Sequence, residues 1–280
     1  MSETHSERCP ALAEGGPTMN IAVCVKQVPD TADLRIDPET NTLIREGVDA
    51  VLNPLDDFPL EAALRLREAS GGTVTAFTMG PPAAEAVLRT AIAMGADDGV
   101  LLSDRAFAGA DTWSTSLTLA AGLRHAGPFD VVLCGKQATD GDTAQVGPGI
   151  AAHLDWPQVT YVLRLGVGEG GRLRVRRMLE SGYAELLVAT PVVLTVLKEA
   201  NEPRLPTLAG RIRAVGREIT TLGAADLGLA PSEVGLEGSP TRVDRIAVPE
   251  SSRSHVRIEG APAECARQLM EALEWGTTQP

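Results

Sequence analysis

Residues 130–148, which read DVVLCGKQATDGDTAQVGP, decide the fold. Asp130 to Cys134 is a short apolar run that is typical of a buried strand, and Val146 to His153 is predicted to be a helix. A strand that passes into a helix through such a loop is typical of an open α/β sheet. At this kind of junction the main-chain N–H groups that open the helix are available to a phosphate group.

The loop between this strand and helix has groups that suit nucleotide binding. Gly135 and Gly141 can adopt positive φ, Thr139 and Thr143 carry hydroxyls, and Lys136 carries a positive charge. It is not a Walker loop, because glutamine follows the Gly-Lys pair, and no GxGxxG motif follows the first strand. From spacing alone, a nucleotide loop and an ordinary turn are equal alternatives, since Asp and Gly are common in turns.

Two acidic residues in this loop bear on the nucleotide interpretation. Asp140 and Asp142 would repel a phosphate if their side chains faced it. We expect Asp142 to cap the following helix, which leaves main-chain N–H groups for the ligand.

Composition limits the classes of function. The chain has 280 residues, of which 44% are hydrophobic and 22% charged, so it is long enough for one large domain with an appendage. A net charge of −12 argues against nucleic acid or an anionic membrane as partner. No apolar run reaches the roughly 20 residues of a membrane span, so membrane insertion is not expected.

The cysteines, histidines and N-terminal residues give few functional signals. The four cysteines and four histidines are dispersed without metal-binding spacing, so the sequence predicts no metal site and no catalytic residue. Reduced thiols are typical of the cytoplasm, which is the predicted location. Residues 1–18 are polar and acidic, and we expect a disordered tail before Met19 rather than a targeting signal.

The first half of the chain alternates strands and helices, which predicts a parallel sheet with right-handed crossovers. Asn53 is predicted to cap a helix with Pro54 in its first turn. A hairpin is expected at residues 34–47, and further helices at residues 82–95 and 112–125. The expected strands are residues 20–28, 73–80, 99–104 and 130–134.

The second half has a different pattern. Residues 159–198 predict three or four consecutive strands with a hairpin turn at residues 168–171, followed by a helix at residues 209–215. Beyond Ala224 the only convincing amphipathic helix is residues 263–275, with Cys265, Leu269, Met270 and Leu273 near one face. Residues 224–280 are therefore expected to form an arm that lies on a partner or on the chain's own sheet, or else a loosely packed extension.

The predicted fold class is thus α/β. It comprises a doubly wound, mostly parallel sheet over residues 19–223, with an added antiparallel hairpin region and an extended C-terminal arm.

Seven short blocks of the sequence occur in the order found in one known family. They are VCVKQVPDT (23–31), NP (53–54), MGPP (79–82), LRTAIAMGAD (88–97), GKQATDGDTAQVG (135–147), LDWPQ (154–158) and NEPRLPTL (201–208). With these blocks the chain resembles the β subunit of electron transfer flavoproteins, from Met19 to about Gly210 and more loosely to the end. The resemblance implies a heterodimer with an α subunit that holds its own FAD, while the β subunit supplies a second nucleotide site.

The resemblance also implies which residues form the nucleotide site. They follow the ends of strands, so they are expected at the carboxyl edge of the sheet, where open α/β folds bind ligands. The implied cofactor-binding residues are Cys24, Asn53, Pro54, Met79, Gly135, Lys136, Gln137, Ala138, Thr139, Asp140, Gly141, Asp142, Thr143, Ala144, Gln145 and Val146.

The identity of the nucleotide depends on the type of family member. Conventional members hold a structural AMP and serve acyl-CoA dehydrogenases, whereas bifurcating and nitrogen-fixation-type members hold a second FAD and accept electrons from NADH. Residues 103–116 resemble a longer loop of the bifurcating members, and DGDTAQVGP departs from the conventional loop, so FAD is favoured. In that case hydride from NADH would reach the β-subunit flavin, and the two electrons would divide between the α-subunit FAD and ferredoxin or flavodoxin.

Three further groups of residues are assigned roles by position and by resemblance. Lys26 and Arg105 are candidates for contacts with flavin or NADH phosphate, or else are solvated charges. Asp104 and Asp111 are candidates for ribose contacts, but loop capping is the simpler role. The resemblance implies that Asn201, Glu202, Pro203, Arg204 and Leu205 form a partner-recognition loop; a plain Pro-rich connector is the alternative.

A stand-alone nucleotide sensor or an adenylylating enzyme is the rival interpretation. An adenylylating enzyme would be expected to carry a pyrophosphate loop or a histidine signature after its first strand, and VCVKQVPDT has neither. A sensor would need no partner, so its C-terminal segment would not have to lie on another chain.

Overall fold

The computed structural model describes residues 18–30, 50–244 and 257–275. The predicted hairpin at residues 34–47 and almost all of the N-terminal tail lie outside these ranges. The chain divides into two compact units, residues 1–243 and 244–280. The first unit contains the sheet, and the described part of the second contains one helix, α6 (Pro262–Trp275), close to the predicted residues 263–275.

A nine-stranded sheet forms the centre of the first unit, in the order β11-β5-β4-β1-β6-β10-β7-β8-β9. The strands from β11 to β7 are parallel, and β8 is antiparallel to both of its neighbours, β7 and β9. The strands are β1 (Met19–Cys24), β4 (Gly72–Met79), β5 (Asp98–Leu102), β6 (Val131–Gly135), β7 (Gln158–Val167), β8 (Leu173–Leu179), β9 (Gly182–Val188), β10 (Val192–Val196) and β11 (Thr220–Leu222).

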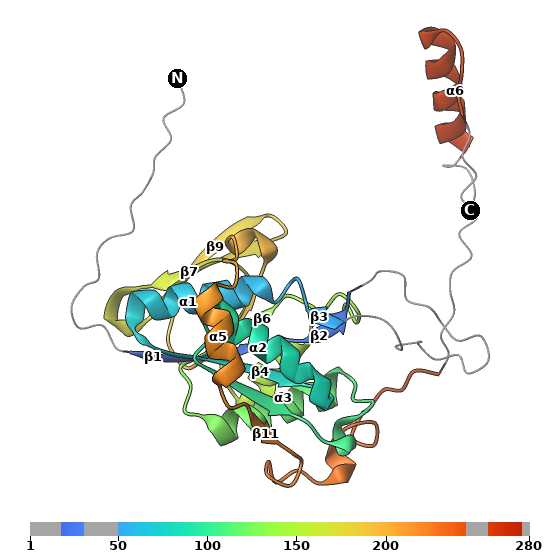
Figure 1. Cartoon of the computed structure of the whole chain (residues 1–280). Coiled ribbons are helices and arrows are strands. Elements are labelled where there is room, and N and C mark those ends of the chain that lie inside the picture. The colour runs from blue at the N-terminus through green and yellow to red at the C-terminus, as the bar shows by residue number, and fades with distance from the viewer. Residues whose placement is uncertain (1–17, 31–49, 245–256, 276–280) are drawn as a thin grey trace. The chain divides into compact units, whose positions relative to one another are not determined.

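Helices cover both faces of the parallel part, which confirms the predicted doubly wound α/β fold (Figure 1). α1 and α2 pack on one face around Ile21, Val23 and Leu133, while α3 and α4 pack on the other around Phe77 and Val132. The helices of this unit are α1 (Asp57–Ser70), α2 (Glu85–Met94), α3 (Thr112–Ala126), α4 (Val146–Leu154) and α5 (Leu208–Gly216).

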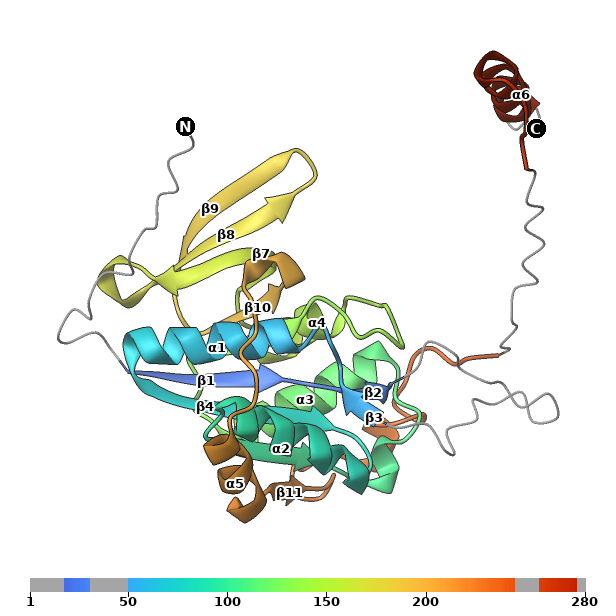
Figure 2. The ribbon, with the colours of Figure 1, turned by 45° about the horizontal axis from the view of Figure 1, so that its top comes forward.

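The antiparallel region is the predicted addition to the sheet. β8 and β9 extend away from the helix-covered part (Figure 2). The turn between β7 and β8 contains Gly170 and Gly171, both with positive φ, at the predicted position. β10 then returns to the parallel sheet beside β6.

The prediction of a single first strand at residues 20–28 is wrong for the second half of that range. β1 ends at Cys24, and residues 27–29 form β2 (Gln27–Pro29), which pairs with β3 (Ala50–Leu52) in a separate two-stranded sheet. The chain leaves the central sheet because the N–H of Lys26 donates to the Asp56 carboxylate instead of to a neighbouring strand.

The segment that follows β11 packs on the first unit. Ala224 and Val234 are buried in the same cluster as Phe107 and Leu222. The predicted boundary between residues 223 and 224 therefore lies inside the first unit, which extends to Val243. Among the described residues, no helix has both the length and the apolar character that membrane crossing demands.

Gly210 in α5 gives a test of helix packing. A Cβ at Gly210 would lie 2.1 Å from the carbonyl oxygen of Ala93, whereas a Cβ at Gly216, in the same helix, would meet nothing within 4 Å. Gly210→Ala should therefore lower the free energy of unfolding by about 1–3 kcal/mol, because α5 must move away from α2. Gly216→Ala is the matched control and should leave stability unchanged or slightly raised in urea unfolding. Equal stability of the two variants would contradict this packing.

Candidate functional site

The order of the strands creates a switch point between β1 and β6. From β1 the chain proceeds to β4 and β5 on one side, and then returns to β6 on the other side. β1 and β6 are in register, with Cys24 opposite Cys134, so the segments that follow them leave the sheet side by side. Ligands of open α/β folds bind at the carboxyl edge of such a point. The loop at residues 135–146 is therefore where a ligand site is expected.

Asn53 connects the two sides of this edge. Its side chain is fully buried; Nδ2 donates to the Gln137 carbonyl at 3.1 Å, and Oδ1 accepts from the Thr139 N–H at 3.3 Å. Its own N–H donates to the Lys26 carbonyl at 2.8 Å. The prediction that Asn53 caps a helix is wrong, because α1 begins only at Asp57. The side chain instead fixes the loop.

Asp56 lies directly beneath the loop and was missed in the sequence. Its carboxylate is buried and accepts the Lys26 N–H at 2.8 Å. A Cβ at Gly135 would lie 2.3 Å from Asp56 Oδ1, so glycine is needed there for close approach and not for positive φ. Burial raises the pKa of Asp56 from 3.8 to about 7. The nearest sequence signal is an acidic residue shortly after Asn-Pro.

The acidic side chains of the loop are engaged by other residues. Asp140 forms an ion pair with Lys26, with Nζ to Oδ1 at 2.7 Å, and Asp142 Oδ1 accepts from Gln137 Nε2 at 2.6 Å. Asp142 does not cap α4 as predicted; the N-cap position is Gln145, which forms no side-chain capping bond. Positive φ is adopted by Asp142 and Ala144 rather than by the two glycines.

The start of α4 consequently has free donors. Within the described part of the chain, no hydrogen bond uses the N–H groups of Thr143, Ala144 or Val146. The first turn of a helix carries a partial positive charge, and its N–H groups favour an anion. Gly147 allows α4 to approach β10, since a Cβ there would lie 2.5 Å from Thr195 Cγ2.

The remaining residues implied for the site lie along the same edge. Cys24 is buried at the end of β1, and Met79 is half-buried at the end of β4. Pro54 follows Asn53 in the turn that leads to α1, where the Asp56 N–H donates to the Asn53 carbonyl. Cys24, Met79 and Pro54 therefore lie at the same carboxyl edge of the sheet as the loop.

Asp104 and Asp111 serve as structural caps. Asp104 accepts from the N–H groups of Ala106 and Ala224, and Asp111 caps α3 through Ser114 while also accepting from Thr241. These bonds lower the pKa of Asp104. Both carboxylates thus attach the segment after β11 to the loop before α3. Arg105 is exposed, and no ion pair among the described residues involves it.

Residues 201–205 are attached to α1. Arg204 donates to the buried Glu61, with Nε to Oε2 at 2.8 Å, and its Nη1 donates to Glu68 at 2.6 Å. Asn201 Nδ2 donates to the Phe58 carbonyl at 2.9 Å, and the Glu202 carbonyl accepts from Arg65. Hydrogen bonds from Arg204 and Arg65 lower the pKa of Glu61 although burial opposes this. Glu61 is a second anchoring residue that the sequence reasoning missed.

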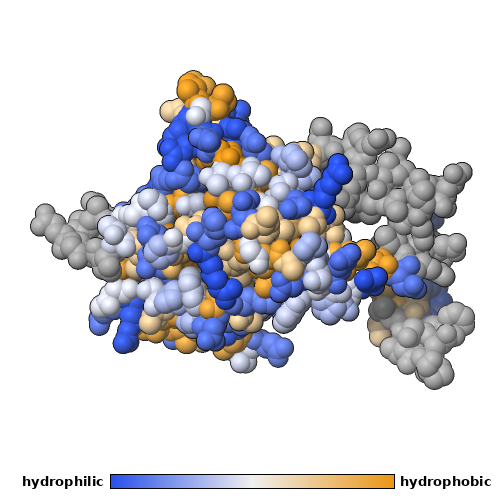
Figure 3. Space-filling model, turned by 90° about the horizontal axis from the view of Figure 1, so that it is seen from below, coloured by the Kyte–Doolittle hydropathy of each residue, from blue (hydrophilic) through white to orange (hydrophobic). Residues whose placement is uncertain are grey.

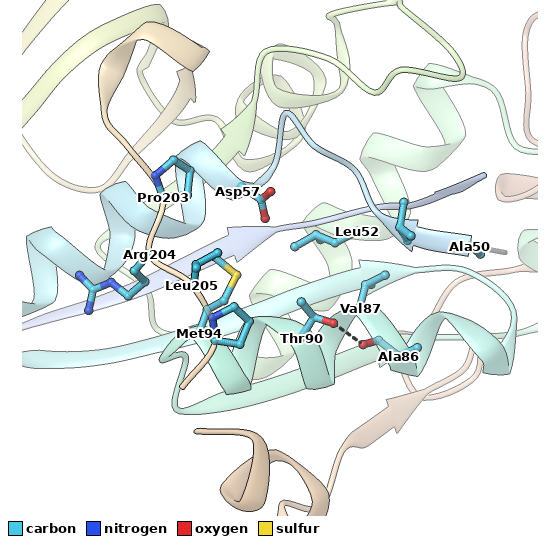
Figure 4. Close-up of a pocket in the computed structure, with 12 residues that line it drawn as sticks. Ala50, Leu52, Asp57, Ala86, Val87, Thr90, Met94, Pro203, Arg204 and Leu205 are labelled. Carbon is cyan, nitrogen blue, oxygen red and sulfur yellow. Dashed lines mark hydrogen bonds between the residues drawn. The ribbon is translucent and has the colours of Figure 1, made fainter. Parts of the chain in front are cut away.

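This segment also borders a groove of about 380 Å³ (Figure 4). Pro203 and Leu205 form one side, and side chains of β3 and α2, including Leu52, Val87 and Met94, form the other. Leu205 is 84% exposed, so most of its apolar surface faces outward.

The raised pKa of Asp56 predicts a pH dependence of stability. Between about pH 4 and 7 the folded chain holds a proton on Asp56 that the unfolded chain has released, so the contribution of Asp56 to the free energy of unfolding falls as pH rises. Asp56→Asn removes this contribution, which changes by about 3 kcal/mol between pH 5 and pH 8. Urea unfolding at pH 5 and pH 8 measures the difference, and a variant with the wild-type pH dependence would refute it.

Comparisons with known proteins identify the family. Residues 40–227 match the model of the electron transfer flavoprotein domain. The chain is 50% identical over 256 residues to electron transfer flavoprotein subunit beta of Thermoanaerobacterium thermosaccharolyticum, covering 91% of this chain and 98% of that protein.

Two other similar proteins have names other than electron transfer flavoprotein subunit beta. Identity is 48% over 258 residues to the caffeyl-CoA reductase-Etf complex subunit CarD of Acetobacterium woodii, covering 91% of this chain and 98% of that protein. It is 46% over 257 residues to protein FixA of Azorhizobium caulinodans, with 88% and 92% covered. The chain therefore belongs to the electron transfer flavoprotein family, as a β subunit that works in electron transfer with an α subunit.

Proposed function

We propose that this β subunit binds an adenine nucleotide, with FAD favoured, at the edge between β1 and β6 and passes electrons to the FAD of its α subunit. The observation that carries the proposal is the uncapped start of α4 beside a loop fixed by Asn53. Free N–H groups at a helix N-terminus are a common phosphate site of α/β folds.

The arrangement of the loop is compatible with a phosphate. Lys26 neutralises Asp140, and the neutral amide of Gln137 holds the Asp142 carboxylate by a hydrogen bond. Thr143 and Ala144 precede α4, and no acceptor among the described residues bonds their N–H groups. The positive φ of Ala144 is a strained conformation of the kind that concentrates at ligand sites.

FAD is favoured over AMP for two reasons. Residues 103–116 and the DGDTAQVGP loop resemble the bifurcating and nitrogen-fixation-type members, and the relatives include a CarD subunit and FixA proteins. On this proposal NADH is the electron donor, and ferredoxin or flavodoxin takes one of the two electrons. If AMP is bound instead, the chain is a conventional β subunit that serves a dehydrogenase.

In this chemistry the protein binds and orients the nucleotide. A bound FAD would supply the redox chemistry, which needs no acid or base from the chain. Asn53 holds the loop in place, Asp56 fixes the turn at Lys26, and the start of α4 stabilises negative charge. Lys26 and Arg105 are the proposed cationic contacts to a phosphate of flavin or NADH.

Exposed apolar side chains supply surfaces for protein partners. Tyr183, Leu186 and Leu187 on β9 are exposed, as are Leu208 and Ile212 on α5. On the face in Figure 3, hydrophobic patches lie among hydrophilic residues. We propose that the α subunit covers part of this surface and contacts the C-terminal arm, and that residues 201–205 face a redox partner.

Counting nucleotides tests the cofactor. The heterodimer with its α subunit is denatured, and the released FAD and AMP are quantified by chromatography. About two FAD and no AMP per heterodimer are expected, since one FAD belongs to each subunit. One FAD with one AMP would reject the FAD assignment, and one FAD with no second nucleotide would reject the nucleotide site.

Leu205→Ala tests the recognition segment. Leu205 is 84% exposed, so the variant should fold and keep its nucleotides. It should slow electron transfer with the redox partner that this segment faces about tenfold or more, mainly through a higher KM, because a buried apolar contact is lost on docking. Val167→Ala, at an exposed position at the end of β7 (40%) that has no proposed partner role, is the control and should behave as wild type. Unchanged kinetics of Leu205→Ala would refute the role.

A further inference from the structure

A second pocket opens beside the loop at the start of α4. It has a volume of about 370 Å³ and lies between the end of β6, α4 and the strands β7 and β8. We propose that this pocket, called the Arg177 pocket, binds the second phosphate of a nucleoside diphosphate group whose first phosphate lies at the start of α4. The residues that line it are Lys136, Ala144, Gln145, Pro148, Gln158, Thr160, Tyr161, Arg177 and Thr195.

The pocket is lined by positive charge, although the chain as a whole is acidic. Lys136 and Arg177 both line it, and no carboxylate does, although the chain has a net charge of −12. Within the described ranges neither cation forms an ion pair, whereas Arg176, the residue before Arg177 on β8, pairs with Glu185. Two cations that share a pocket and lack a counter-ion favour an anionic ligand.

The donors are positioned before any ligand binds. Arg177 Nη2 donates to Thr160 Oγ1 at 3.0 Å, and Arg177 Nε is buried without a hydrogen-bond partner. Lys136 Nζ lies 5.7 Å from the centre of the Tyr161 ring. A guanidinium held in this way suits phosphate, because its N–H groups form a rigid fork.

The backbone of β7 is distorted at the pocket. Tyr161 has φ 59°, a strained value for a non-glycine residue, and its N–H donates to Thr195 Oγ1 at 3.2 Å. The pairing registers of β7 with β10 and with β8 both shift near this point. Bulges that redirect side chains are frequent next to ligand sites, and strain of this kind persists where surrounding structure enforces it.

The pocket is continuous with the proposed phosphate position. Ala144 and Gln145 line it, and Ala144 also supplies one of the free N–H groups before α4. A group that extends one bridging oxygen beyond the first phosphate would enter the pocket, whereas a nucleoside monophosphate ends before it. The pocket therefore selects diphosphate-containing nucleotides. This inference rests on the proposed nucleotide site and explains which nucleotide it takes.

Calorimetric titration with ADP and with AMP tests the selection, on the heterodimer freed of its β-subunit nucleotide. The wild type should bind ADP about tenfold more tightly than AMP, because only ADP has a second phosphate to reach two cations. Arg177→Gln should weaken ADP binding about tenfold and change AMP binding less than about twofold.

The neighbouring residue provides the matched control. Arg176→Gln removes the same charge from β8 outside the pocket and should leave both affinities unchanged. Equal loss of ADP and AMP binding in Arg177→Gln, or equal affinities in the wild type, would overturn the diphosphate pocket while leaving the nucleotide site intact. If neither nucleotide bound the wild type, the proposed function itself would fail, and the pocket with it.

Discussion

The buried amide of Asn53 is the interaction on which the proposed site depends. It donates to the Gln137 carbonyl and accepts from the Thr139 N–H, so that one side chain satisfies two main-chain groups of a loop that follows a different strand. A buried amide without these partners would be costly, which makes the loop conformation and the turn at residues 53–56 mutually dependent. The N–H groups before α4 are held in place by this arrangement, because the Asn53 amide fixes the main chain of the same loop at Gln137 and Thr139.

α1 connects this loop to the proposed partner-facing segment. Asn53 and Asp56 precede its first turn and contact the loop, while Glu61 on the helix binds Arg204. A movement of residues 201–205 would therefore act on the helix that begins beside the nucleotide site. The buried acid at each place differs in character: Glu61 forms ion pairs with Arg65 and Arg204, whereas Asp56 accepts main-chain and side-chain hydrogen bonds and burial raises its pKa.

The sequence predicted the architecture well and the details of the loop poorly. Alternating strands and helices, the turn at residues 168–171 and the C-terminal helix follow from local periodicity, and all three are present. The roles of Asn53 and Asp142 as helix caps were wrong. Asn53 instead forms tertiary hydrogen bonds with the loop, and Asp142 lies before the N-cap position Gln145 and accepts from Gln137 within the loop. The burial of Asp56 and Glu61 could not be predicted, since a buried carboxylate is indistinguishable in sequence from an exposed one near a helix start.

A crystal structure of the heterodimer with its native nucleotide tests the central claim most directly. We predict density for a phosphate group within hydrogen-bond distance of the main-chain N–H groups of Thr143 to Val146, with the Asn53 side chain still bonded to Gln137 and Thr139. A nucleotide bound elsewhere on the β subunit, with this edge filled only by water or by the α subunit, would contradict the account.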